Sequence, residues 1–175
     1  MLNIRKLQYG VAVSLDGYIA GPQGEADWIV MDPDLDFAAI WSQFDTLLMG
    51  RRTYEAAIRR LGPSAFAGKE TFVCSTRLQL RDHSGVTIVP ALTRTWVQAL
   101  KSRDAKDIWL MGGGTLFRHL LDLGEVDSIS VTIVPVLLGD GTPLLPPPYH
   151  PNNLTLLTHR IYKSGTICVT YRVTP

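Results

Sequence analysis

Short apolar segments alternate with amphipathic ones through most of the chain. Runs rich in β-branched and aromatic residues, bounded by glycine or charge, are typical of buried strands. They predict strands over Leu7–Val13, Tyr18–Ala20, Thr46–Met49, Glu70–Ser75, Val86–Val89 and Asp107–Met111. Apolar positions at helical spacing predict helices from Asp32–Asp34 to about residue 43, after Gly50–Thr53 to about Arg60, over Thr93–Lys101 and over Thr115–Leu123.

The last third of the chain is richer in strands. Ser128–Leu138 predicts a long strand that turns at Gly139–Gly141, and Leu154–Tyr162 and Thr166–Val173 predict a hairpin. Strands that alternate with helices favour parallel neighbours. We therefore expect an α/β fold, with a central, mostly parallel mixed sheet flanked by helices and antiparallel C-terminal strands.

Composition narrows the class of protein. With 175 residues, 46% of them hydrophobic and 19% charged, the chain is expected to form a single domain over residues 1–175 rather than a disordered segment. The net charge of +1 gives no nucleic-acid footprint, and no apolar run is long enough to span a membrane. We therefore expect a small-molecule partner, with neither nucleic acid nor membrane.

The positions of the cysteines and histidines bear on the cellular compartment and on whether the protein binds a metal. The two cysteines, Cys74 and Cys168, lie in separate apolar stretches and suggest no disulfide framework. This fits a reducing compartment and predicts a cytoplasmic protein. The four histidines are scattered without the spacing of metal ligands, so we predict no metal site.

The strongest local motif is an apolar strand that runs directly into Gly112–Gly114 and then into a helix at Thr115. The N–H groups and dipole at such a helix start favour an anion, and glycines let a ligand approach the backbone. The spacing matches neither standard nucleotide fingerprint. A tight strand-to-helix turn is the alternative interpretation.

Two further strand ends carry cations. Arg51 and Arg52 follow Gly50 at a helix start, where cations oppose the helix dipole and an anion partner would offset that cost. Ser75, Thr76 and Arg77 follow the next strand and suit a phosphate monoester, although alone they would be interpreted as a polar turn. Ligands of α/β sheets bind outside the carboxyl ends of the strands. The three strand ends together predict a nucleotide phosphate site.

These motifs, in this order, resemble the dihydrofolate reductase-like superfamily. Met49–Glu55 is similar to its Gly-Arg-x-Thr segment, and Gly112–Phe117 is similar to its glycine-rich pyrophosphate segment. Ser14–Ala20, Trp28-Ile29 and Val134–Gly141 resemble more closely the C-terminal reductase domain of the bifunctional riboflavin-biosynthesis deaminase/reductase, RibD. The resemblance covers nearly the whole chain.

The resemblance implies an NADPH cofactor and a role for each matching residue. Gly112, Gly113, Gly114, Thr115 and Leu116 would cradle the pyrophosphate. Gly50, Arg51, Arg52 and Thr53 would bind the adenosine-side phosphates. Ser75, Thr76 and Arg77 would hold the 2′-phosphate and adenine, which favours NADPH over NADH. Ala12 and Ile19 would flank the nicotinamide, and Phe117 would lie near the ring.

The activity implied is an NADPH-dependent reductase that transfers hydride to a pteridine- or pyrimidine-like heterocycle. The nearest named activity is 5-amino-6-(5-phosphoribosylamino)uracil reductase of riboflavin biosynthesis. A dihydrofolate reductase and a non-catalytic NADP-binding protein of the same fold are the alternatives. Related domains are often dimers, so Ile129–Leu138 and the terminal strands have two interpretations, as the surface of a homodimer or as strands buried within one sheet.

Reducing a C=N bond by hydride leaves negative charge on nitrogen, so a nearby acid should supply a proton. In dihydrofolate reductase a carboxylate opens the helix before the Gly-Arg segment, and counting back from Gly50 places Asp34 there. Asp36 is the alternative, and an acid at this helix start also has a simple interpretation as a partner of the dipole. Asp16 is interpreted as a turn residue.

Overall fold

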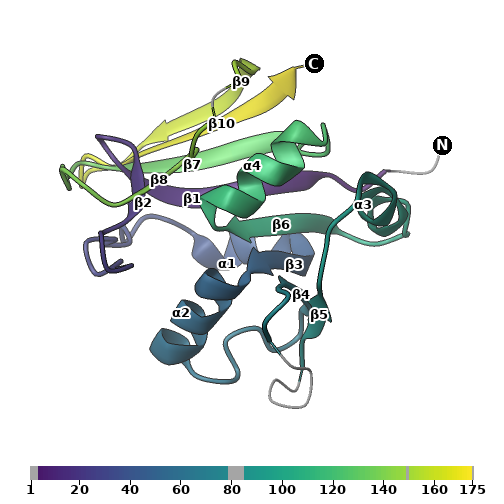
Figure 1. Ribbon diagram of the computed structural model, residues 1–175. Helices are drawn as coiled ribbons and strands as arrows, with labels where there is room; N and C mark the ends of the chain where they lie inside the picture. Colours follow the sequence, from purple (N-terminus) through teal and green to yellow (C-terminus); the bar gives the residue numbers. More distant parts are fainter. Residues whose placement is uncertain (1–3, 79–84, 149, 175) are drawn as a thin grey trace.

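The computed structural model describes residues 4–78, 85–148 and 150–174. Its strands are β1 (Leu7–Ser14), β2 (Tyr18–Ala20), β3 (Phe44–Gly50), β4 (Glu70–Cys74), β5 (Thr87–Val89), β6 (Asp107–Gly112), β7 (Ser128–Val134), β8 (Thr142–Pro143), β9 (Asn153–Ile161) and β10 (Ile167–Thr174). Its helices are α1 (Phe37–Ser42), α2 (Arg51–Leu61), α3 (Arg94–Lys101) and α4 (Gly114–Asp122). Figure 1 shows their arrangement.

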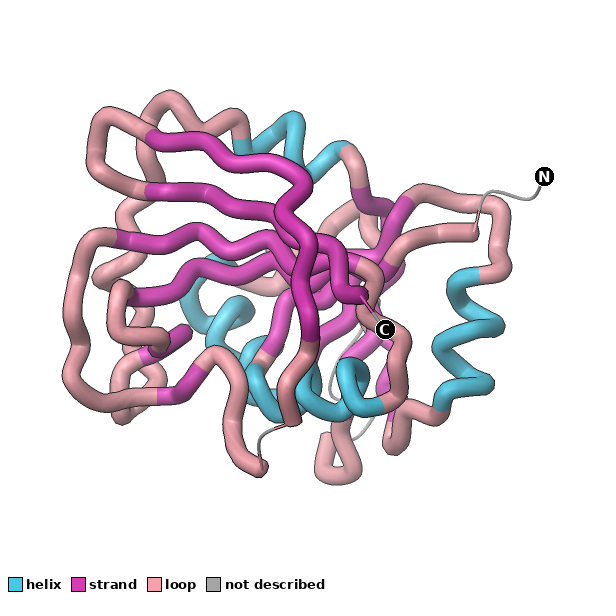
Figure 2. The backbone as a smooth tube through the Cα atoms, turned by 90° about the horizontal axis from the view of Figure 1, so that it is seen from above, coloured by secondary structure: helices cyan, strands magenta, loops and turns pink. Residues whose placement is uncertain are grey.

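Eight strands form one sheet in the order β5-β4-β3-β6-β1-β7-β10-β9, and β2 pairs with β8 in a small second sheet. The neighbours from β5 to β7 are parallel, whereas β10 runs antiparallel to both β7 and β9. Figure 2 shows the long strands lying side by side. The predicted fold class, a mostly parallel mixed sheet with antiparallel C-terminal strands, is confirmed.

Helices cover both faces of the sheet, because the buried strands alternate their side chains between two cores. On one face, Leu48, Leu110 and Tyr9 pack with Leu120 of α4 and Val97 of α3. On the other face, the neighbouring strand residues Leu47 and Met49 pack with Tyr54 of α2. In Figure 1, α4 lies on one side of β6, and α1 and α2 lie on the other.

The helix predicted to open at Asp32–Asp34 begins later, at Phe37. The Asp36 carboxylate caps it by accepting the Ala39 N–H at 2.8 Å. A separate turn precedes it, in which the Asp32 carboxylate accepts the Asp34 N–H at 2.8 Å. Asp and Asn side chains commonly bond backbone N–H groups in this way, and here two such bonds in succession delay the helix.

The long strand predicted over Ser128–Leu138 ends at Val134, because Pro135 has no N–H to donate to a neighbouring strand. Ile129, Val131 and Val134 are buried, so the structure supports burial of this segment within the sheet. The whole of β9 is exposed instead, including Leu154, Leu156 and Ile161. Among the described residues, no helix is long and apolar enough to cross a membrane.

Candidate active site

A pocket of about 170 Å³ lies on the sheet face that carries α1. Strands β1 and β7 form its floor, and its walls come from β6, from the segment that leads into α1 and from the β9–β10 turn. Parallel pairing brings Gly10 beside Ser130 and Ala12 beside Thr132 on that floor. Its lining residues are Gln8, Gly10, Val11, Ala12, Ile29, Val30, Met31, Asp32, Leu35, Phe37, Ile40, Phe44, Trp109, Ser130, Thr132, Val134, Tyr162 and Thr166.

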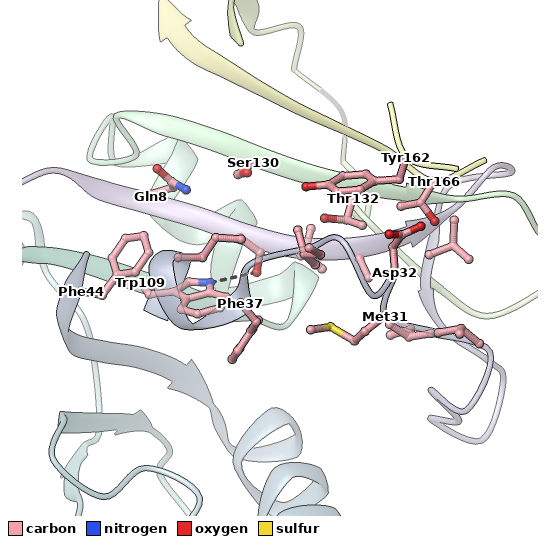
Figure 3. A pocket seen from close by; sticks show the side chains of 18 residues that line it. Gln8, Met31, Asp32, Phe37, Phe44, Trp109, Ser130, Thr132, Tyr162 and Thr166 are labelled. Carbon is pink, nitrogen blue, oxygen red and sulfur yellow. Dashed lines mark hydrogen bonds between the residues drawn. The ribbon is translucent and has the colours of Figure 1, made fainter. Parts of the chain in front are cut away.

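One end of the pocket is polar. Figure 3 shows Asp32, Thr132, Tyr162 and Thr166 gathered there. Asp32 is 6% exposed, and its Oδ2 accepts the Ser164 N–H at 3.2 Å. Hydrogen bonds from the Ser164 hydroxyl and from the Asp34 N–H lower the pKa of Asp32, so its carboxylate is ionised at neutral pH. Burial raises the pKa of Tyr162 and keeps its phenol neutral.

The other end is aromatic, with Phe37, Phe44 and Trp109 around it (Figure 3). The Trp109 ring centroid lies 5.2 Å from that of Phe44 and 5.9 Å from that of Phe37. Its indole crosses β1 at Gly10 and donates from Nε1 to the Gly10 carbonyl at 3.1 Å. A Cβ atom on residue 10 would lie only 2.4 Å from that Nε1, so glycine is required for the indole to lie there.

A second hollow lies at the carboxyl ends of β3 and β4. It is lined by Arg51, Ser75, Thr76 and Arg77, together with Cys74 and Pro90. The structure therefore brings together four residues that the sequence predicted as a phosphate site. The buried Ser75 hydroxyl accepts the N–H groups of Arg77 and Leu78, each at 3.1 Å, and so holds the turn that presents Arg77.

The glycine-rich junction lies next to this hollow, because β3 and β6 are paired and Met49 lies opposite Gly112. Gly50 caps α2 and Gly113 caps α4, with no side-chain bond at either cap. The peptide between Gly112 and Gly113 is cis. A Cβ atom on Gly114 would lie 2.7 Å from the Pro143 carbonyl oxygen, and one on Gly50 would approach the Gly113 nitrogen at 3.8 Å. The starts of α2 and α4 therefore lie at two neighbouring strand ends, each with glycine backbone at its cap.

The other residues predicted to bind a cofactor differ in placement. Ala12 lines the pocket, and the Thr53 hydroxyl lies 3.7 Å from the position of a Cβ on Gly112 or Gly113. Thr115 is exposed at the start of α4. Arg52 is exposed and Ile19 packs against the core, so neither lines the pocket or the hollow.

Phe117 lines neither the pocket nor the hollow, and its predicted place near a ligand ring stays a prediction. Its side chain is 3% exposed and stacks on Tyr9, with the ring centroids 4.0 Å apart. Its N–H already donates to the Gly113 carbonyl at 3.0 Å. The side chain of Leu116 is also buried in the core, so only its backbone can serve a ligand. Both positions belong to the inward face of α4.

The predicted acids lie outside the pocket. Asp34 has a side chain that is 56% exposed, and its carboxylate faces Lys163 at 3.9 Å. Asp36 caps α1. Asp16 lies in a turn, where its carboxylate accepts the N–H groups of Leu138 and Gly139, as its interpretation as a turn residue implies. Asp32 is the acid that lines the pocket, two positions before the one indicated by gapless counting.

Sequence reasoning missed most of the pocket lining. One signal was present: Ser128, Ser130 and Thr132 alternate with Ile129, Val131 and Ile133, which marks a strand with one polar face. Tyr162 and Thr166 have no such signal, because only the β9–β10 turn brings them to Asp32. Among the described residues, no cluster of His, Cys, Asp and Glu has the arrangement of a metal site.

The mostly parallel sheet with helices on both faces is that of an α/β protein with two hollows at its strands. Residues 5–168 match the family model of the RibD C-terminal domain, and the chain belongs to that family. It is 32% identical over 181 residues to the uncharacterized protein YyaP of Bacillus subtilis (strain 168), a match that covers 97% of this chain and 96% of YyaP.

Two solved structures show the same fold. One is a protein from Shewanella sp. PV-4 that is named for riboflavin biosynthesis, with a TM-score of 0.84 and 23% identity over 97% of this chain and 99% of that chain. The other is dihydrofolate reductase from Enterococcus faecalis complexed with NADP(H), with a TM-score of 0.70 and 17% identity over 97% of each chain.

Proposed function

We propose that this protein is an NADPH-dependent reductase that transfers hydride to a pteridine- or pyrimidine-like heterocycle. The observation that carries the proposal is Asp32, a buried carboxylate at the polar end of the pocket whose floor holds Ala12. A family of reductase domains and a fold shared with an NADP(H) complex support the same reaction class.

The chain offers a fitting site for the cofactor. We assign the 2′-phosphate to the hollow lined by Arg51, Thr76 and Arg77, where the two arginines can donate charge-assisted hydrogen bonds. The starts of α2 and α4 suit the pyrophosphate, because the first N–H groups of each helix have no partner within it. A Cβ on Gly50 would meet only the backbone of Gly112 and Gly113, so a phosphate can approach the backbone there, whereas Gly114 is already packed against the Pro143 carbonyl.

Bound NADPH would supply the hydride that a C=N carbon accepts, and the ring nitrogen must then gain a proton. Asp32 is ionised, so it does not itself store that proton in the free protein. Solvent would supply the proton: the negative charge of Asp32 raises the pKa of a ring nitrogen that it contacts, and so favours the protonated, more electrophilic heterocycle. The Thr132 and Tyr162 hydroxyls at the same end can orient the polar edge of the ring.

The proposal is tested by cofactor binding and turnover. Purified protein should bind NADPH more tightly than NADH, which isothermal titration calorimetry measures directly. NADPH oxidation at 340 nm should then depend on an added heterocycle, with 5-amino-6-(5-phosphoribosylamino)uracil, dihydrofolate and unsubstituted pterins compared side by side.

Each result separates the candidate functions. Turnover with dihydrofolate alone would indicate a dihydrofolate reductase. Tight NADPH binding without oxidation across the whole series would indicate a non-catalytic NADP-binding protein. Absence of NADPH binding at millimolar concentration would contradict the proposal.

A cytoplasmic location and a homodimer stay predictions. The exposed β9 gives no preference among partners by itself. Light scattering coupled to size-exclusion chromatography would give the mass of the particle, and therefore test the homodimer directly.

A further inference from the structure

We propose that the substrate carries neither a phosphate nor a carboxylate in this pocket, and that an apolar or aromatic substituent of its ring fills the aromatic end. The inference deepens the proposed function and rests on it. It concerns the class of substrate that this pocket would bind.

The charge of the pocket is the first reason. Of the described residues that line it, Asp32 is the one with a charged side chain, and none is lysine, arginine or histidine. An anionic group inside would lose its hydration without gaining a cation, and would also face the Asp32 carboxylate. A neutral or protonated heterocycle avoids this repulsion, and its N–H groups can donate hydrogen bonds to the Asp32 carboxylate.

The cations near the pocket do not line it, although the charge of Arg160 contributes to the lowered pKa of Asp32. At the polar end, the Arg160 guanidinium lies 4.6 Å from the centroid of the Tyr162 ring and donates to the Asp34 carbonyl at 3.3 Å. Lys163 is 94% exposed and faces Asp34. Behind the aromatic end, the Lys69 ammonium donates to the carbonyls of Trp41 and Phe44 and lies 4.9 Å from the Trp41 ring centroid. None of the three lines the pocket.

The aromatic end is the second reason. Phe37, Phe44, Trp109 and Ile40 surround it, and the Trp109 N–H is already bonded to Gly10. The polar groups in reach are the uncharged Gln8 amide and Ser130 hydroxyl, which Figure 3 shows on the side of β1 and β7. Such a wall favours an aryl or alkyl group by burial and by aromatic contact.

The size of the cavity limits that group. At about 170 Å³ it is smaller than the roughly 300–1,000 Å³ of pockets that take drug-sized ligands. One small ring held at Asp32 and one short substituent at Trp109 is therefore the expected occupant. A charged tail would have to leave the pocket for the rim at Arg160.

A matched ligand series tests this without any turnover. The probes are 2,4-diaminopyrimidine, its 5-phenyl derivative and its 5-(4-carboxyphenyl) derivative, titrated by calorimetry into the full chain with and without NADP⁺. We expect the phenyl group to tighten binding by about tenfold or more, and the added carboxylate to remove that gain. Trp109→Leu should abolish most of the phenyl gain. Trp96→Leu, on the opposite face of the sheet beside Phe72, is the matched control and should preserve it.

A second pair compares 5-amino-6-ribitylaminouracil with and without its terminal phosphate. We expect the phosphate to give no tighter binding. Tighter binding of either anionic ligand than of its uncharged partner overturns the proposal, and Arg160→Met would then show whether the rim is the anion site. Because NADPH binding and oxidation are measured separately, failure of the ligand series leaves the reductase proposal standing, and failure of turnover leaves the ligand series interpretable.

Discussion

The two hollows of this protein carry opposite charge. One is built from short contiguous motifs, and the other from residues far apart in the sequence. The hollow at the ends of β3 and β4 contains two arginines, each from a short contiguous motif. The pocket beside α1 contains one carboxylate, and its polar end is assembled from residues as far apart as Asp32 and Thr166. Phosphate recognition can be built from consecutive backbone and side-chain groups at one strand end. An enclosed pocket for a ring requires walls from several elements.

The largest expected effect comes from the charge of the pocket. Asp32→Asn removes the ion that favours a protonated heterocycle. Assistance to proton transfer by a positioned side chain typically raises a rate by about 10²–10⁴-fold. We expect kcat/KM with the best heterocycle to fall by about that factor, while the Kd of NADPH stays within about twofold. Steady-state NADPH oxidation and calorimetry measure the two quantities.

Asp34→Asn is the matched control, because it changes the same group two residues away at an exposed position. We expect it to retain nearly all activity. If Asp34→Asn lost as much activity as Asp32→Asn, the acid would be the one that counting from Gly50 indicated, and the pocket would close differently around substrate.

Substitutions in the hollow that contains Arg51 and Arg77, the basic hollow, should weaken binding of the cofactor rather than slow the chemical step. Under the proposed cofactor assignment, Arg77→Ala and Arg51→Ala each remove a charge-assisted partner of the 2′-phosphate, worth about 1.5–3 kcal/mol, or roughly 10–100-fold in the Kd of NADPH. NADH lacks that phosphate, so its Kd should change by no more than about threefold. Arg59→Ala, in the last turn of α2, is the control. Equal losses of affinity for NADPH and NADH would show that the 2′-phosphate does not bind in this hollow.

The aromatic end gives a smaller effect that leaves the cofactor untouched. In Gly10→Ala the new Cβ would lie 2.4 Å from Trp109 Nε1, so the indole must move and its bond to the Gly10 carbonyl is lost. Overpacking of this kind costs about 1–3 kcal/mol. We expect binding of the 5-phenyl ligand to weaken by about tenfold, with NADPH binding unchanged. The double variant Gly10→Ala/Trp109→Leu should recover stability but not phenyl binding; weaker NADPH binding in Gly10→Ala would show that the two hollows are coupled.

The same contrast explains what could be predicted from the sequence. The strand-and-helix alternation predicted the sheet, and the contiguous motifs at Arg51 and Ser75–Arg77 predicted the basic hollow. Asp32 was missed because two carboxylates near it, at residues 34 and 36, are equally suited to a helix start, and backbone N–H bonds decide which one turns inward. The burial of Phe117 could not be predicted, because a helix start does not show which side chains point to the core.

The smallest effect concerns a carboxylate that holds the loop between β7 and β8 instead of a ligand. Asp16 accepts the N–H groups of Leu138 and Gly139, and a hydrogen bond from the Ser14 side chain, together with these, lowers the pKa of Asp16 to about 2. Because the pKa of Asp16 in the folded state lies below the unfolded value of about 3.9, the contribution of this carboxylate to stability is present above that value and is lost as pH falls toward 2.

We expect Asp16→Asn to lower Tm at pH 7 by roughly 2–4 °C. Between about pH 4 and pH 2, the variant should lose less additional stability than the wild type. Asp104→Asn, an exposed acid after α3, is the control. Parallel acid profiles for wild type and Asp16→Asn would show that this carboxylate does not hold the loop.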